Sequence, residues 1–248
     1  MGRRSLTCRR TWRGSKKPAG PICQRLGAAS RSVLDAVLPL QCGGCGAPST
    51  RWCAVCSAQL IIGPGEPRVV TPRLDPQVPV FALGRYAGAR RQAIVGAKER
   101  GRADLLVPLA EALDAAVQRL LCWQIVRTPL TLIPAPTRRS AARRRGGDPI
   151  TRVAAAVAHR HRGVTVAPVL RMRALARDSV GLGSGARERN VAGQVVLRRR
   201  PRADLWVAMG DVLVVDDVVT TGATLAESVR VLRHARVPVS AALVIASV

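Results

Sequence analysis

The sequence predicts an α/β protein built on a mainly parallel sheet, with a small cysteine-rich module before it. Three observations lead to this fold class. Short apolar runs alternate with stretches of helical apolar spacing along residues 78–247, which is the order of βαβ units. The run Val212–Val215 is apolar at every position, as in a strand covered on both faces. Two Cys-x-x-Cys pairs lie close together within residues 42–56.

The chain divides into four parts. Residues 1–29 form a basic extension without periodicity, which we expect to be disordered. Residues 30–62 hold a short amphipathic helix pattern followed by the cysteine pairs. Residues 63–79 carry five prolines and are predicted to be a linker. Residues 80–248 form the main domain.

The main domain opens with one strand pattern and two helix patterns. Residues 78–88 include the apolar run Val-Phe-Ala-Leu, typical of a buried strand. Residues 89–101 and 103–123 repeat apolar residues at helical spacing, and the second of these is the longest helix expected. Residues 131–136 are a short apolar run closed by prolines, which predicts another buried strand.

The rest of the domain continues the alternation. The basic loop Thr137–Asp148 precedes a helix over residues 149–161, where Pro149 suits the first turn. Residues 163–172 hold a further strand. A strand over 211–217, a helix over 222–235 and a strand over 239–247 then complete the pattern, listed here in chain order.

Length and composition exclude several classes of protein. With 248 residues and 48% hydrophobic content the chain can bury a sizeable core, although only 2% of its residues are aromatic. No stretch approaches the roughly 18 apolar residues of a membrane span, so we expect no membrane insertion. The basic N-terminus lacks the apolar segment of a secretory signal, and we therefore expect a cytoplasmic protein.

The charge balance is strongly positive. The chain has 40 Lys and Arg residues against 15 Asp and Glu, a formal net charge of +25, and only Lys16, Lys17 and Lys98 are lysines. Such a field attracts polyanions. A GC-rich genome also enriches Arg over Lys, so charge alone gives only weak support for an anionic partner.

Asp216 and Asp217 follow directly after the apolar strand Val212–Val215. In open parallel sheets, ligands bind beyond the carboxyl ends of the strands. The helix that follows presents backbone N–H groups and a dipole that favour phosphate. Gly222 lets the backbone approach a ligand closely, and Thr220, Thr221 and Thr224 add hydroxyl groups.

Neighbouring carboxylates suit a vicinal diol, helped by a divalent metal, rather than a phosphate. A diol on one side and a phosphate on the other describe a ribose 5-phosphate. The alternative is an ordinary helix cap with two exposed acids.

The segment "VLVVDDVVTTGATL" resembles the phosphoribosyl-pyrophosphate (PRPP) motif of type I phosphoribosyltransferases. The resemblance implies the parallel sheet of that fold and Mg²⁺ bound with PRPP. It also implies that Asp216 and Asp217, the catalytic candidates, bind the ribose hydroxyls. The residues implied to grip the 5-phosphate are Thr220, Thr221, Gly222, Ala223 and Thr224.

The cysteines Cys42, Cys45, Cys53 and Cys56 are spaced Cys-x2-Cys-x7-Cys-x2-Cys. Two such pairs can give four thiolates to one tetrahedral structural zinc ion. A redox dithiol or disulfides are the alternatives. A cytosolic chain argues against permanent disulfides, and two pairs exceed the need of a redox site.

A four-cysteine module before a PRPP motif resembles the ComF family of competence-associated proteins. The likeness runs from about residue 31 to 248 and includes residues 85–106, 132–149 and 175–193. One departure lies at Arg145–Pro149, where family members often read Arg-Gly-Phe-Asn-Gln. The family implies a role in handling internalised single-stranded DNA, with a helicase-like competence ATPase as a partner.

A basic segment follows the strand at residues 131–136. Its arginines are candidates for binding pyrophosphate or DNA, because a guanidinium binds phosphate in a bidentate manner; they are Arg138, Arg139, Arg143, Arg144 and Arg145. Lys98, Arg187, Arg189 and Asn190 are further candidates for the same crevice.

Three functions fit these features. The first is ComF-type handling of single-stranded DNA. The second is a catalytically active phosphoribosyltransferase of nucleotide metabolism or salvage, a pentosyltransferase whose acceptor the sequence does not reveal. The third is a non-catalytic protein that senses PRPP or binds DNA. Scarce aromatic residues weaken the DNA function, since sequence-neutral single-strand binders stack bases on aromatic rings.

Overall fold

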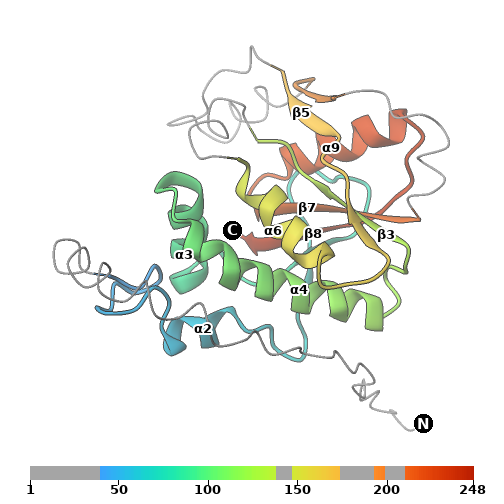
Figure 1. The fold of residues 1–248 in the computed structure, drawn as a ribbon. Coiled ribbons are helices and arrows are strands. Elements are labelled where there is room, and N and C mark those ends of the chain that lie inside the picture. Colours follow the sequence, from blue (N-terminus) through green and yellow to red (C-terminus); the bar gives the residue numbers. More distant parts are fainter. Residues whose placement is uncertain (1–39, 138–146, 174–192, 199–209) are drawn as a thin grey trace, which may run out of the picture.

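The computed structural model describes residues 40–137, 147–173, 193–198 and 210–248. A six-stranded sheet in the order β1-β2-β8-β7-β3-β4 forms its centre (Figure 1). Only β1 is antiparallel to its neighbour, so the expected α/β class with a mainly parallel sheet is confirmed. Its strands are β1 (Arg68–Val70), β2 (Val80–Ala82), β3 (Leu130–Pro134), β4 (Val164–Val166), β7 (Asp211–Val219) and β8 (Val239–Ser247).

Helices cover both faces of the sheet. The described helices are α2 (Ala54–Leu60), α3 (Gly88–Glu99), the 3-10 turn η1 (Ala103–Leu105), α4 (Leu106–Cys122), α6 (Pro149–Ala158) and α9 (Ala223–His234). Helices α3, α4 and α6 pack on one face with Leu213 and Val215 of β7. Helix α9 packs on the other face with Val212 and Val214. Because side chains alternate along a strand, the apolar run of β7 supplies both cores.

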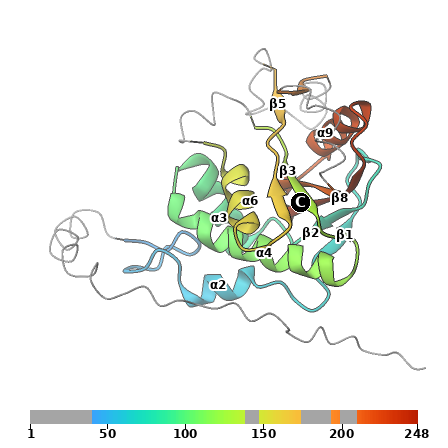
Figure 2. The same cartoon turned by 45° about the vertical axis from the view of Figure 1, so that its right-hand side comes forward.

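The cysteine module packs against the main domain. Helix α2 contacts α3 and α4, and Figures 1 and 2 both show it beside α4. The side chains of Cys42 and Cys56 are buried in the same core as α3 and α4. The module therefore shares a core with the sheet domain.

Three features of the sheet differ from the sequence-based expectation. The proline-rich segment contributes the edge strand β1, whose three residues are too short to give a pattern. Residues 163–172 form two strands, β4 and β5 (Leu170–Met172), and β5 pairs with the unexpected β6 (Val195–Leu197) in a separate antiparallel sheet of two strands, in which β6 contacts α9. Strand β7 continues to Val219, because pairing with β8 holds the two aspartates in extended backbone.

Some expectations concern residues outside the described ranges, among them the extension 1–29 and the helix pattern near residues 33–38. Among the helices of the described ranges, none is both long and apolar enough to cross a membrane.

Candidate functional site

Asp216 and Asp217 lie on β7 just beyond the point where the neighbouring strand β3 ends. The pairing of β3 with β7 ends at Pro134 and Val215, and the N–H of Ala135 donates to the carbonyl of Val215 at 2.8 Å. On the other side, β8 stays paired with β7 as far as Val219. The two acids are therefore held by β8 but lie beyond the end of β3. This is the edge at which parallel sheets bind ligands.

Both acids are buried. Asp216 is 9% exposed and Asp217 6% exposed. A helix cap with two exposed acids, the alternative drawn from the sequence, does not describe this arrangement. Charged carboxylates are rarely buried without partners, so their contacts decide what the site can do.

Lys98, in the last turn of α3, provides the main contact of the pair. Its Nζ lies 2.6 Å from Oδ2 of Asp217. Burial opposes the charge of the lysine, but Asp217 and Asp216 raise its pKa above the ordinary value. Lys98 is therefore held as a cation at this edge.

The backbone positions the two carboxylates as well. The N–H of Asp217 donates to Oδ1 of Asp216 at 2.8 Å, and the N–H of Val218 donates to Oδ1 of Asp217 at 2.7 Å. Burial raises the pKa of Asp216 well above its usual range, and the charge of Asp217 raises it further against the effect of Lys98. The hydrogen bonds thus fix the orientation of both carboxylates, while burial and mutual repulsion disfavour a negative charge on Asp216.

The loop after β7 makes a tight turn directly before α9. Gly222 has a φ of 87°, a left-handed conformation, and α9 begins at the next residue. A Cβ at Gly222 would lie 2.5 Å from the carbonyl oxygen of Leu74 and 2.7 Å from Cβ of Pro72. The N–H of Leu74 donates to the carbonyl of Thr221 at 2.8 Å. The proline-rich segment thus fixes this turn from outside.

The first turn of α9 has little capping of its own. Gly222 gives no side-chain cap, and within the described residues the N–H of Ala223 reaches only Oγ1 of Thr221, at 3.4 Å. The side chain of Thr220 is exposed, and those of Thr221 and Thr224 are half-buried. N–H groups at a helix start, with hydroxyls beside them, form a favourable environment for an anion.

Asp148 is a functional candidate that the sequence analysis did not single out. It caps α6, where Oδ2 accepts from N–H and Oγ1 of Thr151 at 3.1 and 2.7 Å, and Oδ1 accepts from Oγ1 of Thr137 at 3.0 Å. Its charge raises the pKa of both Lys98 and Asp216, so its field acts on the same edge. An Asp directly before a Pro that starts a helix is the signal that could have identified it.

The basic segment predicted to bind pyrophosphate or DNA falls outside the described residues. This holds for Arg138, Arg139, Arg143, Arg144 and Arg145, and for Arg187, Arg189 and Asn190. Lys98 is the candidate cation that lies within the described residues, and its Nζ contacts Asp217.

The four cysteines converge on one point. The Sγ atoms of Cys42, Cys45, Cys53 and Cys56 all lie within 4.8 Å of one another, close enough to bind a metal ion such as zinc. A Cβ at Gly44 would lie 2.4 Å from Sγ of Cys56, so this turn needs a glycine. The donor set and its compact shape fit a tetrahedral ion.

Backbone N–H groups point at the sulfur atoms, as they do around thiolates. Gly44 and Cys53 donate to Sγ of Cys42 at 3.4 and 3.3 Å, and Cys56 donates to Sγ of Cys53 at 3.4 Å. Burial by itself would raise the pKa of Cys42, but the backbone hydrogen bonds lower it to about 6. Burial raises the pKa of Cys56. At least one thiol is thus prepared to bind metal as a thiolate.

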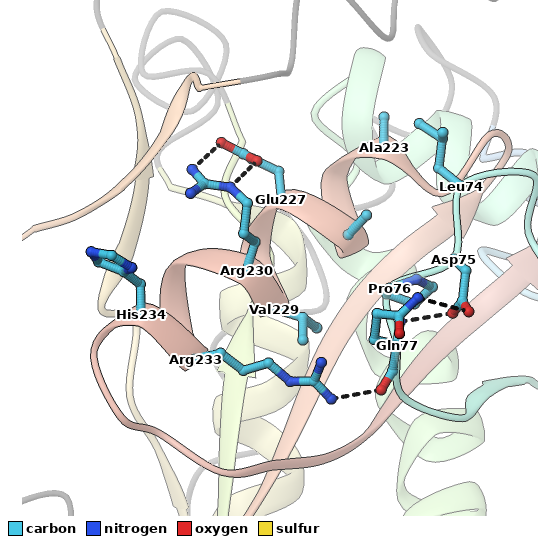
Figure 3. A pocket seen from close by; sticks show the side chains of 11 residues that line it. Leu74, Asp75, Pro76, Gln77, Ala223, Glu227, Val229, Arg230, Arg233 and His234 are labelled. Carbon is cyan, nitrogen blue, oxygen red and sulfur yellow. Dashed lines mark hydrogen bonds and ion pairs between the residues drawn. The ribbon is translucent and has the colours of Figure 1, made fainter.

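A separate hollow of about 630 Å³ lies between α9 and the turn Leu74–Gln77 (Figure 3). Among the residues predicted to bind phosphate, only Ala223 lines it. Its arginines already have partners: Arg230 pairs with Glu227, and Nη2 of Arg233 donates to the carbonyl of Gln77 at 2.6 Å. This hollow is distinct from the edge that holds the acidic pair.

Comparison with models of known protein families gives no match, and neither does comparison with curated proteins. The functional argument therefore depends on the residues of this chain.

Proposed function

We propose that this chain is a phosphoribosyltransferase-like protein that binds PRPP, together with Mg²⁺, at the edge of the sheet beyond β3. The observation that carries the proposal is the buried acidic pair Asp216–Asp217 followed directly by the left-handed turn at Gly222 and the start of α9. Carboxylates accept hydrogen bonds from hydroxyl groups and a helix start favours phosphate, so their order on one short segment supports the proposal.

The residues divide the ligand between them. Asp216 and Asp217 accept hydrogen bonds from the ribose hydroxyls. Backbone N–H groups at the start of α9, with the hydroxyls of Thr220, Thr221 and Thr224, hold the 5-phosphate. Mg²⁺ bound with PRPP supplies positive charge to the pyrophosphate. Transfer from such a site requires positioning and charge stabilisation more than a general base.

The residues of this site do not identify the acceptor substrate of a phosphoribosyl transfer. A salvage-type phosphoribosyltransferase and a protein that only senses PRPP share the pocket and differ in turnover. Release of pyrophosphate in the presence of candidate nucleobases or amines distinguishes them, because only an enzyme breaks the bond between ribose C1 and pyrophosphate.

Calorimetric titration with PRPP and Mg²⁺ tests the binding proposal. We expect micromolar-range affinity for the wild type and none for the double variant Asp216→Ala/Asp217→Ala. The matched control is Glu99→Ala/Glu111→Ala, which removes the same charge from two exposed helical positions and should bind like the wild type. Absence of PRPP binding by the wild type would reject the proposal.

A second function is supported by charge. The net charge of +25 and the ComF-type sequence pattern favour a role in handling internalised single-stranded DNA, alongside a helicase-like ATPase. A labelled single-stranded oligonucleotide should bind with an affinity that falls steeply as salt rises. Displacement of the oligonucleotide by PRPP would place both ligands at one site, and simultaneous binding would place them at two.

A further inference from the structure

The acidic pair presents an electrostatic difficulty for the proposed ligand. Asp216 and Asp217 are buried next to each other, and the charge of Asp148 reaches the same edge. A ligand that carries phosphate groups adds negative charge to this environment. Like charges in a partly buried site repel strongly, so a cation must be present for the diol to bind there.

Among the described residues, Lys98 is the cation that contacts the acidic pair. It lies at the end of α3, on the face of the sheet that α3 shares with Leu213 and Val215. Its side chain is 34% exposed, yet its Nζ contacts Oδ2 of Asp217 at 2.6 Å. Lysine is a compact point charge, which suits the neutralisation of a carboxylate at close range.

The contact still leaves hydrogen-bonding capacity on the acids. Oδ1 of Asp217 accepts from the N–H of Val218, and Oδ2 faces Lys98. Each carboxylate oxygen has two acceptor positions, so both oxygens can accept a further hydrogen bond. The Asp217 carboxylate is therefore oriented by two donors before a ligand arrives, and it remains able to bind a hydroxyl.

We propose that Lys98 is a positioning residue that acts as the built-in counter-ion of the acidic pair, so that the ribose 5-phosphate part of the ligand binds without a divalent cation at these carboxylates. Mg²⁺ is then needed only for the pyrophosphate part. This inference rests on the proposed PRPP function and specifies how its sugar site works.

Titration with ribose 5-phosphate, which lacks pyrophosphate, tests the inference. Affinities are measured with and without Mg²⁺ for the wild type, Lys98→Met and Lys98→Arg. Methionine keeps the length of the side chain and removes its charge. The matched control is Arg100→Met, which removes one exposed positive charge just after α3.

We expect the wild-type affinity for ribose 5-phosphate to change less than about twofold when Mg²⁺ is added. Lys98→Met should bind at least about tenfold more weakly without Mg²⁺, because the acids lose their counter-ion, and Mg²⁺ should restore most of the loss. Lys98→Arg should retain part of the affinity, and Arg100→Met should match the wild type. Rescue by Mg²⁺ separates this role from a purely structural one.

Two results overturn the inference while leaving PRPP binding intact. One is a wild-type affinity for ribose 5-phosphate that depends strongly on Mg²⁺, which can be measured even if Lys98→Met fails to fold. The other is equal behaviour of Lys98→Met and the wild type. If the wild type binds neither ribose 5-phosphate nor PRPP with Mg²⁺, the proposed function itself fails, and the inference fails with it.

Discussion

At the scale of single residues, Arg90 is one of the described side chains that bury a polar atom without a hydrogen-bond partner. It is 9% exposed, and its Nε has no hydrogen-bond partner among the described residues. Burial lowers its pKa, and the charge of Glu66 only partly offsets this effect. A Cβ at Gly84 would lie 2.2 Å from Nη1 of Arg90, so the guanidinium fills the space left by a glycine.

Replacing Arg90 by leucine should leave the free energy of unfolding unchanged or raise it by about 1 kcal/mol, because a buried donor without a partner is removed. The matched control is the neighbouring Arg91, which is exposed and lies over the ring of Tyr86 at 5.8 Å. Arg91→Leu should cost about 0.5–1 kcal/mol. Urea denaturation measures both. A clear loss of stability in Arg90→Leu would mean that the guanidinium has a favourable partner, with Glu66 the first candidate.

The residues of the candidate site differ in how far the sequence reveals them. Asp216, Asp217 and Gly222 lie on one continuous segment, so their order alone indicates a ligand site. The contact between Lys98 and Asp217 joins residues far apart in the chain. No local pattern specifies that the end of α3 reaches the end of β7, and the sequence therefore offers Lys98 only as one candidate among several.

At the scale of elements, α3 depends on the cysteine module for its first turn. Its N-cap residue is Ala87, which has no capping group. The N–H of Ala89 donates instead to Oε1 of Gln59 in α2, at 3.1 Å. A residue thirty positions earlier thus satisfies one of the N–H groups that a helix start leaves open.

Gln59→Ala should therefore destabilise the start of α3, at a cost of about 0.5–2 kcal/mol, as for the loss of a helix cap. Hydrogen exchange of the first-turn amides of α3 should quicken, while the amides of α4 stay protected. Gln118→Ala is the matched control, since Gln118 makes only a long contact of 3.4 Å to Asp114 within α4. Unchanged exchange at Ala89 and its neighbours in Gln59→Ala would show that the contact contributes nothing.

The elements that the sequence predicts well are those with many repeats of one period. The helices α3, α4, α6 and α9 show such patterns, and the buried strands β3 and β8 are recognised by continuous apolar runs instead. Strands β1 and β6 have three residues each, and pairing with neighbours rather than their own composition makes them strands. Likewise, β7 continues through two aspartates, which are poor strand formers, because β8 supplies its partner atoms.

At the scale of the whole molecule, the cysteine module and the sheet domain are also joined by contacts around Leu105 and Arg102. Leu105 is buried, and a Cβ at either Gly43 or Gly96 would lie 2.4 Å from one of its methyl groups, so it packs tightly between the module and α3. The side chain of Arg102 donates through Nη1 to the carbonyl of Gln41 at 2.9 Å. The backbone N–H of Arg102 donates to the carbonyl of Gly96, in α3, at 3.0 Å. Helix α3 carries Lys98 in its last turn, beside the acidic pair.

Metal removal should therefore affect more than the cysteine module. We expect the purified protein to hold one zinc ion per chain, and Cys56→Ser or a strong chelator to lower the Tm by at least about 5 °C, roughly 1–2 kcal/mol for a chain of this size. Because α3 packs on the module, hydrogen exchange should quicken in α3 as well as in α2.

Cys122→Ser is the control for this experiment, since Cys122 is exposed and outside the cluster, and it should keep both the metal content and the Tm. Absence of bound metal in the wild type would contradict the zinc prediction and favour the alternative of a redox role for the four thiols. Loss of metal that changes exchange in α2 alone would show that the module does not position α3. Quicker exchange in α3 together with weaker PRPP binding would instead establish that the fold around the cysteines holds Lys98 in place at the acidic pair.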